Sequence, residues 1–137
     1  MQKLSDRVGT FTDSVIRRMT RINNQYDSIN LSQGFPDFDP PQELLDALAK
    51  TAYQGPHQYA VTFGAQNFRE ALAKKVSPTL HHEVDPNTEI CVTCGGTEAM
   101  MAAMMTVCNP GDKVMIFSPF YENYGADAIL SGAEPIY

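Results

Sequence analysis

The sequence predicts an α/β protein with a doubly wound, incomplete three-layer α/β/α domain, and three observations lead to this prediction. Two short apolar segments, 89–93 and 113–117, each precede a stretch with helical periodicity, at 97–107 and 120–130. The last residues, 133–137, have the composition of one more strand. Alternating strands and helices are typical of a parallel sheet with right-handed crossovers. Because parallel sheets bury both faces, we expect a sheet of two or three strands to be unfinished.

Composition excludes several classes of function. The net charge of −6 and the lack of a Lys/Arg cluster argue against a nucleic-acid-binding surface. No apolar run approaches the roughly 20 residues that span a bilayer, and the first residues lack the apolar core of a signal peptide. We therefore expect a cytoplasmic protein without a nucleic-acid or membrane partner.

The three cysteines are Cys91, Cys94 and Cys108. The first two form a C-x-x-C pair, which suggests redox chemistry or zinc. No second pair exists, and His81 and His82 do not complete a zinc-ligand spacing. We expect no metal site and buried thiols that pack as small apolar residues. An odd number of cysteines also suits a reducing compartment.

The first part of the chain predicts one helix and one long loop. Over residues 10–26, apolar side chains recur at helical spacing with arginines between them, which indicates an amphipathic helix that packs on something else, such as a partner subunit. Residues 28–31 are expected to be extended. Residues 32–41 then contain too many Gly, Pro and Asp for regular structure.

Two more helices are expected before the first predicted strand. Asp39 is placed as the side-chain cap of a helix that ends before Gly55-Pro56. A second helix is expected over 65–76, after an irregular aromatic stretch at 57–64. Its inward face is predicted to consist of Phe68, Ala71, Leu72 and Val76.

Gly and Pro residues mark where the second predicted strand and the helix after it begin and end. Asn109-Pro110-Gly111-Asp112 has Pro and Gly at the second and third positions of a turn. Ser118-Pro119 is expected to end the strand at 113–117. Gly132 is expected to end the helix that precedes the last strand.

The stretch Gly95-Gly96-Thr97 joins the strand at 89–93 to the helix at 97–107. The first N–H groups of a helix lack acceptors within the helix, and the helix dipole makes this end positive. Glycine lets a ligand approach the backbone closely. An anion site, typically for phosphate, is therefore one interpretation, and an ordinary strand-to-helix turn is the other.

Four segments in the same order resemble motifs of the class I/II aminotransferases that depend on pyridoxal 5'-phosphate (PLP) and have the fold type I architecture. They are Leu31–Phe38, Gln58–Tyr59, Gly95–Thr97 and Phe117–Tyr121. The resemblance extends from about Ile29 to the last residue and is nearest to the aspartate and kynurenine aminotransferase branch. It implies an enzyme that transfers an amino group between an amino acid and a 2-oxo acid, with PLP as cofactor.

The resemblance implies a role for five residues. The N–H groups of Gly96 and Thr97, with the Thr97 hydroxyl, would bind the cofactor phosphate. The ring of Tyr121 would stack on the cofactor's pyridine. The phenol of Tyr59 would reach the phosphate of the neighbouring subunit, which implies a homodimer. The main-chain N–H of Gly34 would lie near the substrate carboxylate.

The sequence departs from the family pattern in its catalytic residues. In the family the Schiff-base lysine, the aspartate that pairs with the pyridine nitrogen and the arginine that binds the substrate carboxylate all lie further along than position 137. None of the lysines here, Lys3, Lys50, Lys74, Lys75 and Lys113, stands at the matching position. We therefore assign no catalytic residue and expect this chain alone to be inactive.

The resemblance also divides the chain. Residues 1–45 would be an N-terminal arm and small-domain segment with the substrate-side loop, and residues 46–137 the first part of a truncated PLP-binding large domain. Two alternatives stay open. One is a PLP-dependent carbon–sulfur lyase of the same fold, and the other is a non-catalytic chain that binds a phosphate-bearing ligand or pairs with a partner.

Overall fold

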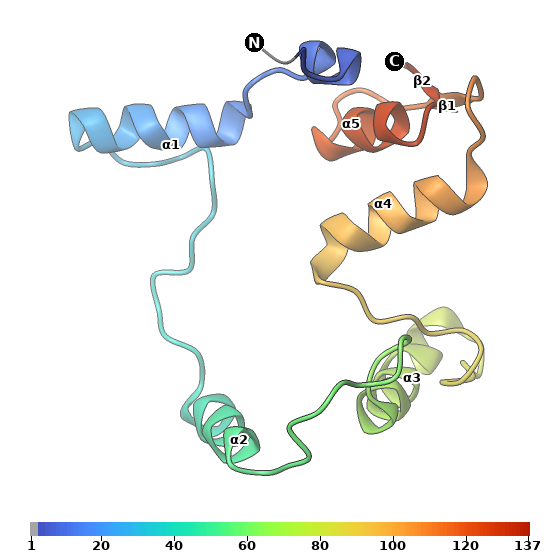
Figure 1. Cartoon of the computed structure of the whole chain (residues 1–137). Helices are drawn as coiled ribbons and strands as arrows, with labels where there is room; N and C mark the ends of the chain where they lie inside the picture. Colours follow the sequence, from blue (N-terminus) through green and yellow to red (C-terminus); the bar gives the residue numbers. More distant parts are fainter. Residues whose placement is uncertain (1–2) are drawn as a thin grey trace. The chain divides into compact units, whose positions relative to one another are not determined.

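The computed structural model describes residues 3–137 and contains mainly helices (Figure 1). In chain order the elements are η1 (Asp6–Thr10), α1 (Val15–Tyr26), α2 (Gln42–Ala52), α3 (Gln66–Leu80), α4 (Gly95–Val107), β1 (Lys113–Met115), α5 (Asn123–Leu130) and β2 (Glu134–Ile136). They form two compact units. Unit 1 consists of the described residues up to Asp39 together with Met100–Tyr137, and unit 2 is Pro40–Ala99.

The sheet lies in unit 1 and is parallel, as the alternation of strands and helices predicts. Lys113 of β1 pairs with Glu134 of β2, and α5 connects the two strands (Figure 1). Ala128 of α5 has no exposed surface, so the small core of this unit lies under that helix. The strand expected at 133–137 is thereby confirmed, and the one at 113–117 is confirmed over its first three residues.

The turn before β1 has the expected geometry. The N–H of Asp112 donates to the carbonyl of Asn109 at 3.1 Å. Gly111 has φ +91°, a value that glycine adopts without strain and that type II turns require at the third position.

Helix α1 is the amphipathic helix expected near the N-terminus, and it begins at Val15 rather than at residue 10. The side chain of Ser14 accepts a hydrogen bond from the N–H of Arg17 at 3.3 Å and so caps the helix. Asp27 ends it in the left-handed region, with φ 47°. Val15, Met19 and Ile22 on its apolar face are 56%, 40% and 40% exposed.

Helix α2 begins differently from the sequence prediction. Its N-cap is Pro41, and no side chain caps the helix, so the assignment of Asp39 as the cap was wrong. The side chain of Gln42 instead bonds along the helix, donating from Nε2 to Asp46 Oδ1 at 2.8 Å.

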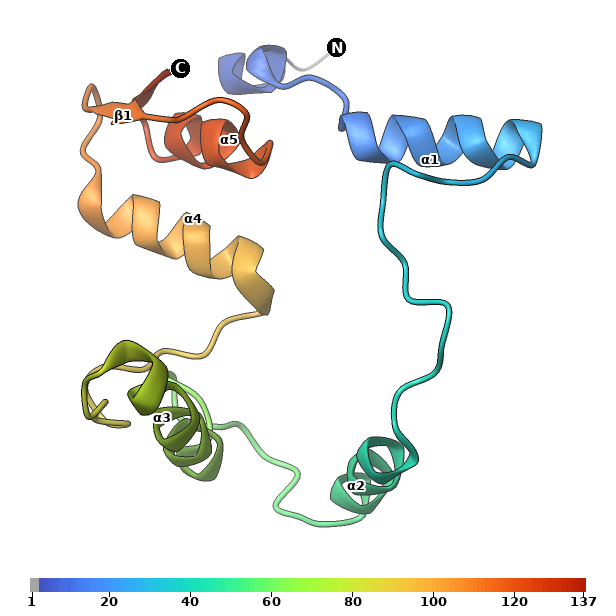
Figure 2. The same ribbon diagram turned by 180° about the vertical axis from the view of Figure 1, so that it is seen from behind.

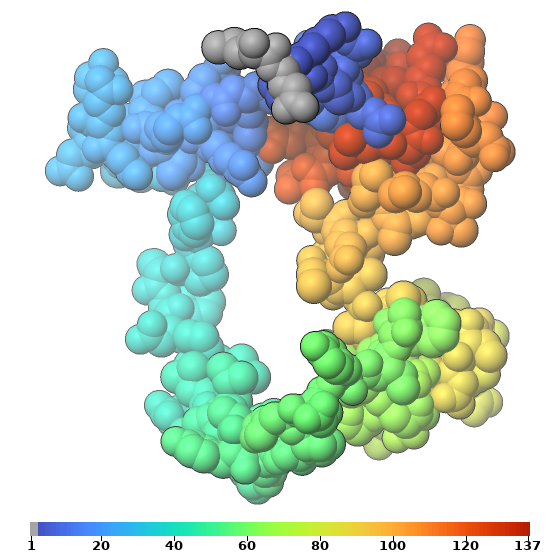
Figure 3. All heavy atoms as spheres, viewed as in Figure 1, coloured from blue at the N-terminus to red at the C-terminus, as the bar shows by residue number. Residues whose placement is uncertain are grey.

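Every residue from 31 to 63 is exposed, and Figure 3 shows this stretch in cyan to green.

Helix α3 is longer than expected, and its buried side only partly matches the predicted one. It continues to Leu80 and contains Pro78. Leu72 and Val76 are half-buried, but Ala71 is exposed. Phe68, placed on the inward face by periodicity, is 52% exposed, whereas Arg69 and Ala73 are 5% and 6% exposed. The guanidinium of Arg69 donates to the carbonyl of Gly64, before the helix in sequence, and to that of Pro86, after it. These bonds compensate for the burial of its charge.

The strand expected at 89–93 is absent among the described residues. Of the backbone bonds of this segment that the described structure contains, one reaches a distant part of the chain, from the N–H of Val92 to the carbonyl of Phe63 at 3.0 Å. A strand requires a continuous ladder with a neighbouring strand, and a single bond does not form one.

A turn at Asp85–Glu89 precedes this segment. The backbone N–H of Asn87 and the hydroxyl of Thr88 donate to the Asp85 carboxylate and lower the pKa of Asp85. The N–H of Asp85 donates to the Glu89 carboxylate at 2.7 Å, and this bond, followed by the one to His82, lowers the pKa of Glu89.

Cys91 and Cys94 are exposed, and Cys108 is half-buried, so the expectation of buried thiols was wrong for the C-x-x-C pair. Within residues 3–137, no three His, Cys, Asp or Glu side chains gather as a metal ion would require. None of the helices in that range is both long and apolar enough for a membrane span.

Asp127 of α5 is 5% exposed, and its Oδ2 has no hydrogen-bond partner in the described part of the chain. Burial raises the pKa of this carboxyl above its ordinary value. The folded state therefore binds the proton more tightly than the unfolded state, and stability falls as pH rises from the ordinary value through the raised one.

We expect Asp127→Asn to melt at a higher temperature than the wild type at pH 7, because the amide carries no charge to desolvate. The difference should vanish below about pH 4, where the carboxyl is protonated in both states. Thermal unfolding followed by circular dichroism between pH 3 and pH 8 measures it, with exposed Asp37→Asn as control. An advantage of Asp127→Asn that is constant with pH would contradict the assignment.

Candidate cofactor site

The turn before α4 shapes the proposed phosphate site. The N–H of Gly95 donates to the carbonyl of Thr93 at 2.9 Å, and the Thr93 hydroxyl donates back to the carbonyl of Gly95 at 3.0 Å. Gly95 has φ +81°, which a residue with a side chain rarely adopts. These two bonds fix the point at which the chain enters the helix.

Gly96 and Thr97 occupy the first turn of α4, and both are exposed. A Cβ added to Gly96 would meet no atom within 4 Å, so its lack of a side chain is not required by packing within the chain. The N–H groups of this turn point out of the positive end of a 13-residue helix. The arrangement suits an anion that needs close contact with the backbone.

Glu98 is a part of this turn that sequence reasoning missed. Its carboxylate accepts a hydrogen bond from the backbone N–H of Cys94, one residue before the helix. The bond resembles a capping box, in which an acidic side chain in the first turn reaches back to the N-cap. A Glu four residues after Cys94 is the sequence signal that predicts this bond, and its carboxylate places a negative charge in the first turn of α4.

Tyr59 lies in the irregular stretch between α2 and α3 and is fully exposed, at 101% of its reference surface. It lines an open hollow in unit 2 together with Thr51 in the last turn of α2 and with residues that follow the helix, namely Gln54, Pro56, His57 and Gln58. Its phenol is available to a ligand or to a second chain.

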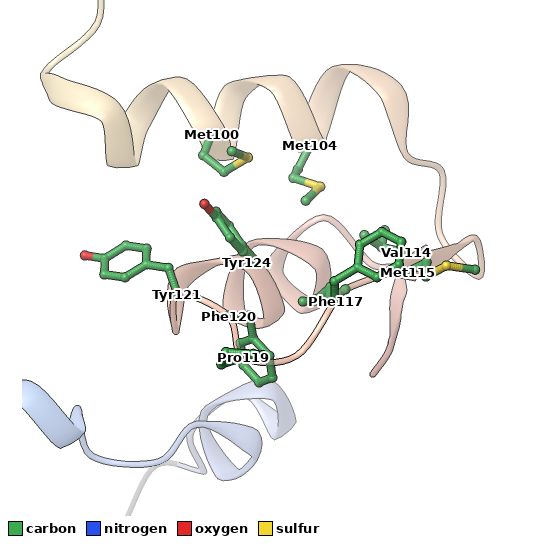
Figure 4. A pocket seen from close by; sticks show the side chains of 10 residues that line it. Met100, Met104, Val114, Met115, Phe117, Pro119, Phe120, Tyr121 and Tyr124 are labelled. Atoms are coloured by element: carbon green, nitrogen blue, oxygen red, sulfur yellow. The ribbon is translucent and has the colours of Figure 1, made fainter.

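Tyr121 precedes α5 in unit 1 and is 49% exposed. Its ring meets that of Tyr124 edge-on, with centroids 6.0 Å apart. Both tyrosines line an open cavity of about 460 Å³ between α4 and the segment from β1 to α5, and Figure 4 shows Tyr124 directed toward Met100. The other lining residues are apolar: Met104, Val114, Met115, Ile116, Phe117, Pro119 and Phe120. An exposed ring face beside such a cavity suits a flat aromatic ligand.

Gly34 lies in the loop after α1, in unit 1, and a Cβ there would meet nothing within 4 Å. No backbone–backbone hydrogen bond involves residues 29–39 in the described structure, so the N–H of Gly34 is not used by a turn or a strand. Gly34 and Tyr121 therefore belong to unit 1, and Tyr59, Gly96 and Thr97 to unit 2.

These residues fit the two parts of PLP separately. The start of α4 offers exposed backbone donors for a phosphate, and Tyr121 offers an exposed ring face for a pyridine. No lysine of the described chain is placed to form a Schiff base with PLP at these positions. None stands in the first turn of α4, and none lines the cavity beside Tyr121.

Solved structures similar to this one are aminotransferases of fold type I. A methionine aminotransferase from Escherichia coli superposes with a TM-score of 0.89 and 36% identity over 99% of this chain and 36% of its own. The N-succinyldiaminopimelate aminotransferase of Mycobacterium tuberculosis superposes with a TM-score of 0.88 and 31% identity over 98% of this chain and 35% of its own. The class that the fold defines is thus an α/β aminotransferase, of which this chain forms a partial domain.

The family model for aminotransferase class I and II matches residues 26–137. The chain belongs to this family. Among curated relatives, the methionine aminotransferase of E. coli is 41% identical over 119 residues, covering 87% of this chain and 31% of the relative. A kynurenine–oxoglutarate transaminase of Dictyostelium discoideum is 34% identical over 134 residues, covering 97% and 31%. The chain thus spans about a third of the length of these relatives.

The variant Gly96→Ala should change affinity for a phosphate ligand without lowering the stability of the fold. Alanine fits the space and favours the helix, so we expect stability to stay equal or to rise by up to about 0.5 kcal/mol. The added methyl group lies where a phosphate would touch the backbone, so affinity for the phosphate should fall about tenfold, or about 1.4 kcal/mol.

Calorimetric titration with PLP, and with pyridoxal that lacks the phosphate, measures the second effect. Only the affinity for PLP should fall. Gly9→Ala, at another position where a Cβ meets nothing within 4 Å, is the matched control. Equal affinity of the Gly96→Ala variant and the wild type for PLP would remove Gly96 from the site.

Proposed function

We propose that this chain forms the phosphate-binding part of a PLP-dependent aminotransferase, which transfers an amino group between an amino acid and a 2-oxo acid. The observation that carries the proposal is the family match over residues 26–137. The exposed Gly95-Gly96-Thr97 turn at the start of α4, inside the matched region, supports it.

Each candidate residue has a proposed task. Gly96 and Thr97 hold the cofactor phosphate with N–H donors, and Tyr121 supports the pyridine ring by stacking, which contributes about 1 kcal/mol beyond area burial. Gly34 donates its N–H to the substrate carboxylate. When bound, PLP supplies an electron sink for bonds at the amino-bearing carbon.

We propose that the functional form is a homodimer. Its support is the full exposure of Tyr59, whose phenol would reach the phosphate site of the second copy. The proposed division of the chain is an arm and small-domain segment at 1–45 and the first part of the large domain at 46–137. The three free cysteines suit a reducing compartment such as the cytoplasm.

The 41% identical relative is named a methionine aminotransferase, so methionine is the first amino donor to test. The decisive experiment joins this chain to the part of the E. coli enzyme that follows the matched segment. The chimera should transfer the amino group of methionine to a 2-oxo acid in a PLP-dependent manner. The 137-residue chain alone should show no turnover, because none of its lysines matches the family's catalytic one.

The unmodified E. coli enzyme is the control for the assay. A folded, PLP-loaded chimera without amino transfer would refute the proposal. Release of pyruvate from cystathionine, without dependence on a 2-oxo acid, would favour the carbon–sulfur lyase of the same fold.

A further inference from the structure

The loop that carries Gly34 is attached to helix α1 by side chains. After α1 ends, the chain runs back alongside the helix, as Figures 1 and 2 both show. Residues 29–39 have no backbone–backbone hydrogen bonds within the described structure. The conformation of this loop must therefore depend on side-chain contacts.

Asn30 supplies most of these contacts. Its Oδ1 accepts two hydrogen bonds from Ser32, one from the backbone N–H at 3.0 Å and one from the hydroxyl at 2.7 Å. Its Nδ2 donates to the hydroxyl of Thr20 in α1 at 3.4 Å. Asn30 is half-buried, whereas Ile29 and Leu31 beside it are 87% and 91% exposed. The polar side chain thus faces the helix, and its apolar neighbours face outward.

Thr20 is itself held by the helix. Its hydroxyl donates to the carbonyl of Ile16 at 3.0 Å, which leaves the oxygen to accept from Asn30. The side-chain oxygen of Gln33 lies 3.5 Å from the same hydroxyl, a longer alternative for its single proton. A chain of polar contacts therefore runs from the body of α1 through Asn30 to Ser32, two residues before Gly34.

We propose that Asn30 and Thr20 are positioning residues that hold the Ser32–Gly34 segment in the conformation that presents the Gly34 N–H to a substrate carboxylate. The role rests on the proposed function of Gly34. Neither side chain needs to touch the substrate, because both act through the loop. Helix α1 thereby serves as the support of the substrate-side loop.

The test uses the 137-residue chain and two separate NMR readouts. The first is the exchange rate of the Ser32 amide, which Asn30→Ala should raise about 3- to 10-fold through loss of its hydrogen bond. Asn30→Asp keeps the acceptor oxygens and should restore the slow rate. Thr20→Val keeps the shape without the hydroxyl and should raise the rate less, and Thr20→Ser should restore it.

The second readout is the shift of the Gly34 amide signal during titration with acetate, a minimal carboxylate. In the wild type this signal should move with saturation, and Asn30→Ala should weaken the apparent affinity by at least about threefold, following the lost hydrogen bond. Asn24→Ala, an exposed asparagine of α1, is the matched control and should change neither readout.

The outcomes distinguish the positioning role of Asn30 and Thr20 from the proposed role of Gly34. A Ser32 exchange rate that is unchanged in Asn30→Ala overturns the positioning role. A faster rate with unchanged acetate affinity also overturns it, because the loop conformation would then not matter for binding. A wild-type Gly34 signal that ignores acetate refutes the proposed function of Gly34 itself.

Discussion

Replacing Arg69 with methionine is expected to lower the free energy of unfolding of unit 2 by about 2–4 kcal/mol. The guanidinium is almost completely buried and donates to the carbonyl of Gly64 at 3.0 Å, to the carbonyl of Pro86 and to the side chain of Gln66. Methionine fills similar space but leaves these acceptors without a donor. Because the bonds join the segment before α3 to the turn after it, their loss should loosen both ends.

Urea unfolding followed by circular dichroism measures this loss. Lys74→Met, at an exposed position of the same helix, should change stability by less than about 0.5 kcal/mol. Arg69→Lys keeps the charge but not the fork of donors, so its stability should lie between those of the wild type and Arg69→Met. Equal midpoints for Arg69→Met and Lys74→Met would show that the buried guanidinium does not hold the unit together.

Gly64→Ala is expected to cost about 2–4 kcal/mol, the sum of backbone strain and overpacking. Gly64 has φ +103°, which disfavours any side chain. A Cβ at this position would lie 2.6 Å from Cβ of Val92 and closer still to its Cγ2. The Cβ of Val92 cannot rotate away, and its backbone is tied to Phe63 by the 3.0 Å hydrogen bond.

A double-mutant cycle with Val92→Ala divides this cost. Truncating Val92 removes the contact with its Cγ2 but leaves the contact with its Cβ and the strained φ, so the double variant should recover only part of the loss. Gly9→Ala, where the added Cβ meets nothing, serves as control. If Gly64→Ala proves as stable as Gly9→Ala, the close approach of residues 64 and 92 is not part of the folded state.

Local signals in the sequence predict much of the fold correctly. The helices α1, α2 and α4 and the parallel pair of strands follow from periodicity and from the turn at Asn109–Asp112, where Gly111 has the positive φ that the turn type requires. Helix α4 begins at Gly95, two residues before the predicted start at Thr97, so Gly96 lies in its first turn. These features depend on residues close in sequence, which is why a single sequence contains them.

The errors concern features that depend on distant residues. The segment 89–93 has the composition of a strand, but its one long-range backbone bond in the described structure is that to Phe63, and it forms no ladder. Periodicity placed Phe68 inside and gave Arg69 no role, because the carbonyl that Arg69 meets at Pro86 lies 17 positions away. Composition cannot reveal which distant backbone groups will satisfy a buried cation.

For the candidate site, the sequence predicts the start of a helix but not the charge that lies there. The Gly-Gly-Thr pattern identifies a helix start with accessible donors, whereas the contact between Glu98 and the N–H of Cys94 depends on the side-chain conformation. The contacts of Asn30 with Thr20 across ten positions likewise require the return of the chain along α1.

The uninterrupted exposure of residues 40–63, all in unit 2, has a calorimetric consequence. This run carries large apolar side chains, among them Leu48, Tyr53 and Tyr59, which are 69%, 90% and 101% exposed. Any molecule that covers them removes apolar surface from water, and such association has a negative heat-capacity change. The enthalpy of binding to this run should therefore become more favourable as the temperature rises, while ligands that contact only the start of α4 should show little such dependence.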